Sequence, residues 1–99
     1  MFNEETFYED EDFEIKVSYH EDMEYVHPFV HVTYYTNFNK SILKKSRLKF
    51  KELCSKLYNE KYTTLFSYTE NVKYASLIDK TYKVLEKYDN MRLIAWDLQ

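Results

Sequence analysis

The sequence PFVHVTYYT (residues 28–36) runs directly into NKSILKKSRLKFKELCSKLYNE (residues 39–60), and this junction decides the predicted fold. The first segment is rich in β-branched and aromatic residues, with apolar side chains on both faces, which is typical of a strand inside a covered sheet. In the second segment, apolar residues recur with the helical period and most lysines fall opposite them. This pattern predicts an amphipathic helix over residues 41–58.

The ends and the buried side of this helix follow from the same residues. Asn39 or Ser41 is the predicted N-cap, and Asn59 is the predicted C-terminal stop. Ile42 lies off the predicted buried stripe and is expected to make flank contacts. Cys54 lies on that stripe, so we interpret it as a small buried hydrophobe rather than a nucleophile. The predicted stripe comprises Leu43, Ser46, Phe50, Leu53, Cys54, Leu57 and Tyr58.

The remaining chain supplies strands and a second helix. Residues 12–19 alternate apolar and polar side chains, which predicts a half-buried strand, and residues 62–68 predict another. A second helix is predicted from Thr69 or Asn71 to about residue 88, followed by a last strand over 91–98. We therefore predict an α/β (α+β) fold of order β-β-α-β-α-β, with a mixed sheet of four to five strands, two helices and right-handed crossovers.

Charge is strongly segregated along the chain. Residues 1–25 hold ten acidic residues and one lysine, a balance of −9, whereas residues 40–61 hold eight basic and two acidic residues, a balance of +6. These opposed fields either neutralise each other or present a dipolar surface to partners. Residues 1–11 lack periodicity and are predicted to form a mobile acidic arm, which leaves residues 12–99 as the single folded domain.

Composition excludes several classes of site. The chain has no glycine, where average usage gives about seven, so Gly-rich phosphate loops and dinucleotide fingerprints are excluded. Positive-φ positions are expected to be occupied by Asn and Asp instead.

A single cysteine excludes an internal disulfide. No apolar run approaches the ~20 residues that span a bilayer, and the acidic N-terminus is not typical of a targeting peptide. We expect a soluble protein of the cytoplasm, or of the host cytoplasm if its source is viral, with no membrane partner.

Residues 26–98 resemble the C-terminal half of the GCN5-related N-acetyltransferase (GNAT) fold, in particular its small, truncated bacteriophage versions. The segment VHPFVHVTYYTNFNKSILKKSRLKFKELCSKL (residues 26–57) is similar to that family's central strand, cofactor turn and first long helix. The segment YTTLFSYTENVKYASLIDKTYKVLEKYDNMRLI (residues 62–94) is similar to its strand, Asn-initiated helix and final strand.

The resemblance implies an N-acetyltransferase that binds acetyl-CoA, with the pyrophosphate held on backbone N–H groups between strand and helix. The family's turn contains glycine, and the matching turn here does not. In the second helix, the resemblance places Tyr82 as general acid. Mid-strand His31 is a candidate base, although the sequence identifies no carboxylate that would orient it. The positions matched to the cofactor turn are Asn37, Phe38, Asn39, Lys40 and Ser41.

Because no catalytic motif is complete, our first functional hypothesis is a non-enzymatic interaction protein that needs no cofactor. It would bind and modulate a host or viral protein, as a phage accessory factor does. The N-acetyltransferase is the alternative. A homodimer is also considered, since the predicted strands at 12–19 and 62–68 can leave edges that pair. The predicted partner-binding residues are Tyr8, Glu9, Asp10, Glu11, Asp12, Tyr19 and Tyr25.

A further alternative is contact with nucleic acid through the basic helix, or mimicry of nucleic acid by the acidic arm. The overall negative charge argues against the first of these. No metal site is predicted, because His27 and His31 on a strand lie ~13 Å apart and residues 9–12 lack the ligand spacing of an EF-hand. The candidate phosphate contacts are Lys44, Lys45, Arg47 and Lys51.

Overall fold

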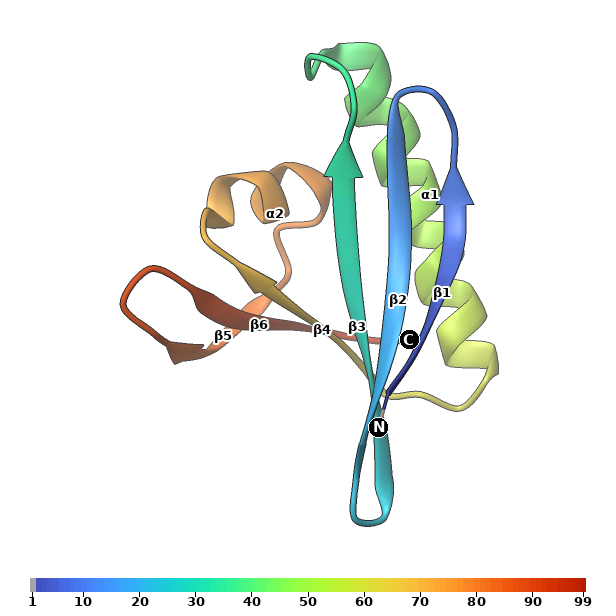
Figure 1. Ribbon diagram of the computed structural model, residues 1–99, viewed down its shortest axis with the longest axis vertical. Helices are drawn as coiled ribbons and strands as arrows, with labels where there is room; N and C mark the ends of the chain where they lie inside the picture. The colour runs from blue at the N-terminus through green and yellow to red at the C-terminus, as the bar shows by residue number, and fades with distance from the viewer. Residues whose placement is uncertain (1) are drawn as a thin grey trace.

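Two helices lie on one side of a mixed sheet in the computed structural model, which describes residues 2–99 (Figure 1). The fold is α+β, and within these residues the sheet has six strands in the order β1-β2-β3-β4-β6-β5. The elements, in chain order, are β1 (Phe2–Glu9), β2 (Phe13–Asp22), β3 (Tyr25–Tyr34), α1 (Lys40–Asn59), β4 (Thr64–Thr69), α2 (Val72–Ile78), β5 (Lys83–Lys87) and β6 (Arg92–Asp97).

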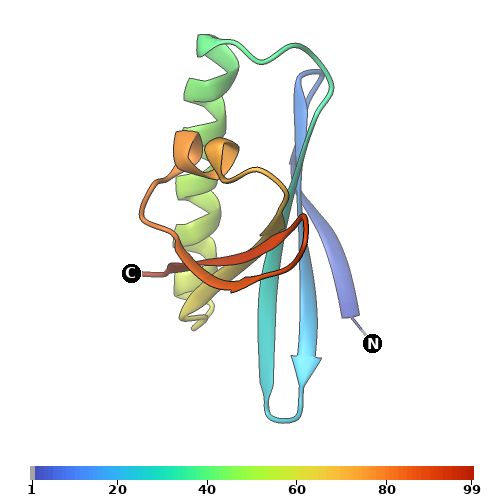
Figure 2. The same cartoon turned by 90° about the vertical axis from the view of Figure 1, so that its left-hand side faces the viewer.

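The sheet consists of two antiparallel halves joined by one parallel contact. Strands β1, β2 and β3 form an antiparallel meander, and β4, β6 and β5 form a second antiparallel group. Helix α1 connects β3 to β4, which pair in parallel at Phe29 opposite Phe66. Beyond this contact β3 and β4 point in different directions, and Figure 2 shows the helices on one side with the long β2–β3 hairpin on the other.

The core lies between α1 and the sheet. The buried residues of α1 recur at the helical period, and Trp96 of β6 closes the core beside Phe50, with their ring centroids 4.8 Å apart. The two halves of the sheet thus share one apolar layer. The buried residues on the sheet side include Phe13, Ile15, Val17, Leu65 and Ile94, and those on α1 are Ile42, Ser46, Phe50, Leu53 and Leu57.

Helix α1 is one residue longer at each end than the predicted range 41–58. Asn39 is the N-cap, and its side-chain oxygen accepts a hydrogen bond of 2.9 Å from the Ile42 N–H. The helix ends at Asn59. The predicted stripe is wrong at its margins, because Ile42 rather than Leu43 is buried and Tyr58 is half exposed. Asn71 is the N-cap of α2, one of the two residues predicted for that role.

The prediction of a mobile arm over residues 1–11 is wrong for the described residues, and residue 1 lies outside them. Residues 2–9 form β1, which pairs antiparallel with β2, for example with Glu4 opposite Ser18. Phe7 and Tyr8 pack against the core. The strand could not be predicted from its acidic composition, because the cationic and hydroxyl groups that bind its carboxylates are brought close only when the chain folds.

The second predicted helix is much shorter than expected, and the predicted four to five strands are six. Helix α2 ends at Ile78, where Asp79 Oδ1 accepts hydrogen bonds from the Thr81 N–H (2.9 Å) and hydroxyl (2.6 Å). This Asx turn ends the helix. Residues 83–87 then form β5 against β6. The predicted crossover from β4 to the last strand is wrong, because β6 is antiparallel to β4. The strand that α2 connects in parallel with β4 is β5, on the other side of β6.

Two further expectations need correction. Strand β3 is not covered on both faces by the described residues, since both helices pack on the same side. Strands β2 and β4 are interior strands, so they offer no edge for a homodimer; the sheet edges are β1 and β5. Positive φ occurs at Met23 (47°) in the β2–β3 turn and at Lys61 (77°) after α1, rather than at Asn or Asp.

Lys61 occupies the left-handed position that ends α1. The Lys61 N–H donates to the Tyr58 carbonyl (3.0 Å) and the Tyr62 N–H to the Leu57 carbonyl (3.0 Å), which together form a Schellman motif. We expect Lys61→Gly to raise the free energy of unfolding by about 0.5–1 kcal/mol, because glycine adopts positive φ without a Cβ clash. Urea unfolding measures this change.

The matched control is Lys51→Gly in the middle of α1. There we expect the opposite sign, a loss of about 1 kcal/mol, because glycine is a poor helix residue. If both substitutions destabilise the protein equally, the left-handed strain at Lys61 is not significant.

Candidate functional site

A cleft opens where β3 and β4 separate. It has a volume of about 620 Å³ and lies between the C-terminal half of β3, the end of β4, and α2. Its position follows from the topology, because the two parallel strands pair at Phe29 and Phe66 and then diverge. Ser67 stabilises the apex of this divergence by donating a hydrogen bond of 3.1 Å to the Val30 carbonyl.

The cleft combines an apolar floor with polar groups near its rim. Phe50, Ile94 and Trp96 form the floor. The Trp96 indole N–H donates to the Asp79 carbonyl at 3.0 Å, which holds the ring in place and links the floor to the end of α2. Such a surface suits a ligand with an apolar body and a few hydrogen-bonding groups. The polar lining residues include Thr36, Asn37, Ser67 and Thr69.

The predicted cofactor turn lies at the mouth of this cleft. Asn37 and Phe38 line it, and Asn39 caps the adjoining N-terminus of α1. The Phe38 ring makes edge contacts with Tyr34 (5.1 Å) and Tyr74 (6.3 Å), so it bridges β3 and α2 at the mouth. Lys40 and Ser41, the first residues of α1, are exposed beside it.

The two predicted catalytic residues are placed differently. His31 is among the residues that line the cleft, but it is exposed and, opposite Lys16 in the register, its side chain lies on the sheet face that carries Phe29. Partial desolvation there lowers the pKa of the imidazole below its ordinary value. Tyr82 is not among the residues found to line the cleft; its hydroxyl lies 3.0 Å from the Ser76 hydroxyl and its ring packs near Trp96. The described geometry therefore does not bring the two predicted catalytic side chains together.

The predicted acidic contact surface is largely occupied by internal interactions. Lys45 of α1 binds both Asp10 and Asp12, at 2.9 Å for Asp12, and the Tyr8 hydroxyl donates to Asp10 at 2.6 Å. The other Asp10 oxygen accepts from the N–H groups of Asp12 and Phe13. Donation by Lys45, then by Tyr8, holds the pKa of Asp10 well below its usual range.

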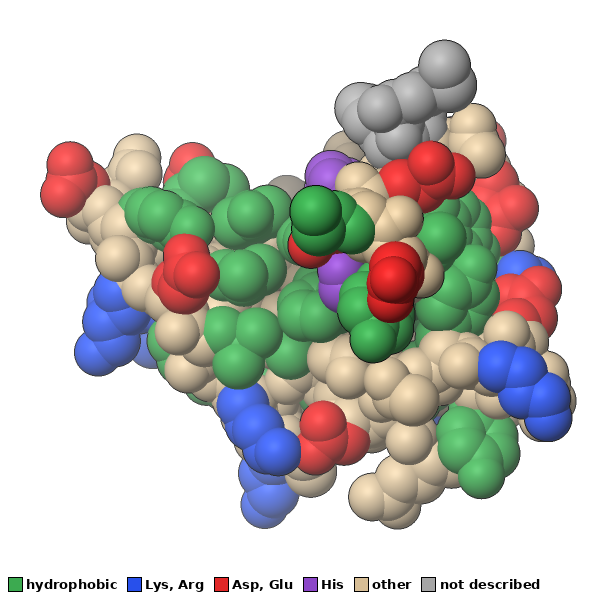
Figure 3. All heavy atoms as spheres, turned by 90° about the horizontal axis from the view of Figure 1, so that it is seen from below, with side chains coloured by type: hydrophobic (Ala, Val, Ile, Leu, Met, Phe, Trp, Pro, Cys, Tyr) green, Lys and Arg blue, Asp and Glu red, His purple; other side chains and the backbone are tan. Residues whose placement is uncertain are grey.

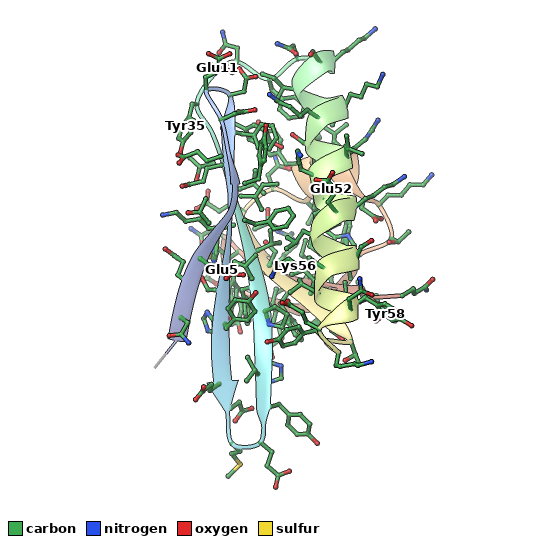
Figure 4. All side chains as sticks on the ribbon, turned by 90° about the vertical axis from the view of Figure 1, so that its right-hand side faces the viewer. Glu5, Glu11, Tyr35, Glu52, Lys56 and Tyr58 are labelled. Atoms are coloured by element: carbon green, nitrogen blue, oxygen red, sulfur yellow. The ribbon has the colours of Figure 1, made fainter. Side chains whose placement is uncertain are left out.

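A second charged cluster joins the other end of β1 to α1. Figure 4 shows Glu5 and Lys56 pointing toward one another; their charged atoms are 3.4 Å apart, and Lys56 also binds Glu60 at 3.1 Å. Tyr19 donates its hydroxyl to Glu5 at 2.7 Å. This bond lowers the pKa of Glu5, and burial together with the Glu5 carboxylate raises the pKa of Tyr19.

The remaining predicted contact residues are exposed. The Tyr35 hydroxyl donates to Glu9 at 2.7 Å, which raises the pKa of Tyr35 to about 12. Glu11 lies in the turn between β1 and β2, near Tyr35 in Figure 4. Tyr25, at the tip of the β2–β3 hairpin, has 67% of its surface exposed.

Two of the four predicted phosphate contacts are used inside the protein. Lys45 belongs to the aspartate cluster, and Arg47 Nε donates to the Leu77 carbonyl at 2.7 Å, which fastens α1 to α2. Lys44 and Lys51 are exposed on α1. These placements reduce the basic surface that the helix presents to a nucleic acid.

Several cleft residues were missed from the sequence, notably Tyr74 and Ile78 of α2 and Trp96 of β6. No local pattern marks these positions as a site, because the cleft exists only where two strands distant in sequence diverge.

Neither helix within residues 2–99 is long and apolar enough to cross a membrane. Among the same residues, no group of three or more His, Cys, Asp or Glu side chains is placed to hold a metal ion. Comparison with protein-family models, curated proteins and solved structures finds no match to this chain.

The aspartate cluster predicts a specific pH dependence. Because the folded pKa of Asp10 is depressed, its stabilising contribution is present above the unfolded value of about 3.9 and is lost as pH falls through the folded value. We expect Asp10→Asn, which keeps the acceptor for the backbone N–H groups, to lose less stability than the wild type between about pH 5 and pH 2. Thermal unfolding over this range measures the difference.

Glu11→Gln, in the same turn, is the control and should follow the wild-type profile. If Asp10→Asn loses as much stability as the wild type when the pH falls, the Lys45–Asp10 contact does not contribute to stability in solution.

Proposed function

We propose that the protein binds an acyl-CoA, or a closely similar nucleotide thioester, in the cleft between β3 and β4. One observation supports this most strongly. The cleft lies at the carboxyl ends of two parallel strands and beside the N-terminus of the 20-residue helix that connects them. In α/β sheets this is the position where phosphate-bearing ligands bind.

The N-terminus of α1 is suited to the pyrophosphate. The Asn39 side chain accepts a hydrogen bond from the Ile42 N–H. The N–H groups of Lys40 and Ser41, in the first turn, have no acceptor within the helix. The positive end of the helix dipole and the Lys40 ammonium both favour an anion there. The turn lacks glycine, so we expect an anion to bind the N–H groups of the first turn of α1 rather than those of the preceding loop.

The cleft itself is suited to the pantetheine arm. Past the contact with β4, the β3 main chain from His31 to Tyr34 lines the cleft. An extended chain with two amide groups can hydrogen-bond to such a strand as an added strand does. The apolar floor would take the methylene groups, and a volume of about 620 Å³ is in the usual range of ligand sites.

Kinship with the GNAT fold and transfer of the acyl group belong to the same proposal. The succession of β3, α1, β4, α2 and the final strands supports the kinship. For transfer, His31 and Tyr82 are the residues predicted from the sequence, and their geometry does not support the roles. By register the His31 imidazole lies on the sheet face that carries Phe29, and the Tyr82 hydroxyl is directed at Ser76.

Isothermal titration with CoA and acetyl-CoA tests the proposal. We expect saturable binding, weakened about tenfold in Lys40→Glu, because the substitution places a negative charge where the pyrophosphate binds. Lys51→Glu is the matched control: it makes the same change in charge on an exposed position of α1 farther along the helix, and should bind like the wild type.

Equal weakening in both variants would indicate a general effect of net charge rather than a site at the N-terminus of α1. Absence of binding heat at millimolar CoA would overturn the ligand proposal altogether. If the protein binds acetyl-CoA but transfers no acetyl group to amine substrates, the binding role is supported and the transferase role is refuted.

A second candidate function, interaction with a protein partner, is favoured by one different observation. The face of the sheet opposite α1 carries exposed tyrosines that no helix of the described chain covers. We propose this face as the contact surface, in place of the N-terminal acidic residues that bind Lys45 and Lys56.

A further inference from the structure

The sheet face opposite α1 carries a continuous series of contacting aromatic rings. Phe29 stacks on Phe66 (centroids 5.3 Å apart) and on Tyr68 (5.5 Å), and His27 meets Phe66 edge-on at 5.5 Å. Tyr25 and Tyr88 extend the series at either end, each with a centroid distance of 6.4 Å. We name this surface the aromatic band: Tyr25, His27, Phe29, Phe66, Tyr68 and Tyr88.

The band is exposed at several points. Tyr25, Tyr68 and Tyr88 have 67%, 41% and 50% of their surface accessible. Both helices lie on the other side of the sheet, where Arg47 binds the Leu77 carbonyl and links them. Figure 3, seen from the end of the β2–β3 hairpin, shows hydrophobic and histidine side chains gathered together with acidic side chains beside them. A central strand that is apolar on both faces is typical of a sheet covered on both faces.

The surroundings of the band are negatively charged. In the strand register Glu4 is opposite Ser18, and Ser18 is opposite Phe29, so these three side chains lie on the same face of the sheet. Asp22 is opposite Tyr25 on that face. The two lysines of this face are already paired, Lys16 with Glu4 (3.6 Å) and Lys83 with Asp97 (2.8 Å). By register, the carboxylates on this face are Glu4, Glu9, Glu14, Asp22, Glu86 and Asp97.

We propose that the aromatic band binds a basic amphipathic helix of a partner protein. An apolar stripe at i, i+3, i+4 and i+7 would lie on the rings, and flanking Lys and Arg side chains would meet the surrounding carboxylates. The exposed Tyr25 and Tyr68 are the residues best placed to dominate the binding energy, since interface hot spots favour tyrosine. This inference rests on the interaction role proposed for this face, and the band meets the cleft at Tyr68, which lines both.

Two other kinds of occupant fit less well. The carboxylates would repel the phosphates of a nucleic acid, although aromatic rings alone could stack on its bases. An added strand would pair at a strand edge rather than lie on this face. The unpaired part of β3 lines the cleft, and both outer edge strands are interrupted by register shifts, at Thr6/Tyr8 in β1 and Val84/Glu86 in β5. Such bulges disfavour edge pairing. A helix laid across the face needs no edge.

The test uses two synthetic peptides of about 18 residues, long enough to form a helix on a surface. Both carry leucine at the same amphipathic positions; one has lysine and the other glutamate at the remaining positions. Fluorescence anisotropy of the labelled peptides measures binding to the full-length protein. We expect saturable binding of the Leu/Lys peptide, weaker at higher salt, and at least tenfold weaker binding of the Leu/Glu peptide.

Matched variants separate the band from general attraction to an acidic protein. We expect Tyr25→Ser with Tyr68→Ser to weaken Leu/Lys binding about tenfold, and Tyr58→Ser to leave it unchanged, because Tyr58 lies on the outer side of α1 (Figure 4). Glu4→Lys should weaken binding more than Glu52→Lys, since the two carboxylates are similarly exposed but only Glu4 lies beside the band.

Three results would overturn the inference. Equal effects of the band and α1 variants would show that the peptide binds by net charge alone, and the interaction role of this face would fail with it. Band-dependent binding of the Leu/Glu peptide would retain the interaction role but refute a basic partner. If light scattering shows that the wild type is a dimer and that Tyr68→Ser is a monomer, the face binds a second copy of the chain instead.

Discussion

The parallel contact of β3 with β4, at Phe29 opposite Phe66, is the constraint on which the rest of the structure depends. Helix α1 fills the space beside this contact with Phe50, which packs on Trp96 and so joins the two antiparallel halves of the sheet. Because the strands pair so briefly, each half keeps its own direction and twist. One consequence is a cleft on the helix side, and another is a stack of rings on the opposite side.

Part of the segregated charge of the sequence is paired within the molecule. Lys45 and Lys56 lie near opposite ends of α1, and each binds carboxylates of the N-terminal strands. Each bond is partly exposed, so its individual contribution is modest. Together they fix the position of the β1–β2 hairpin against α1, which closes the core over Phe13 and Val17. Mutual neutralisation therefore describes these two clusters, whereas Lys44, Lys51 and Glu9 stay exposed.

The two proposed sites differ in chemistry as well as in location. The cleft adjoins the positive end of α1 and has an apolar floor, which favours an anionic ligand with a flexible chain. The aromatic band is surrounded by carboxylates, which favours a cationic partner. The two surfaces adjoin at Tyr68, which belongs to the band and also lines the cleft. A protein of this size with two such surfaces is suited to act where a small ligand and a protein partner meet.

The sequence by itself determined the local structure: the strand–helix junction, the Asn39 and Asn71 caps, the end of α1 and the α+β class. These depend on short-range hydrogen bonds and on the periodicity of apolar residues. The tertiary structure alone decided the rest. Residues 2–9 and 83–87 carry too many charges to be predicted as strands, and they become strands because β2 and β6 offer a partner. The turn matched to a cofactor loop was found from sequence, whereas the cleft beside it and the aromatic band were not. Both arise where segments distant in sequence converge or diverge, and no local pattern encodes that geometry.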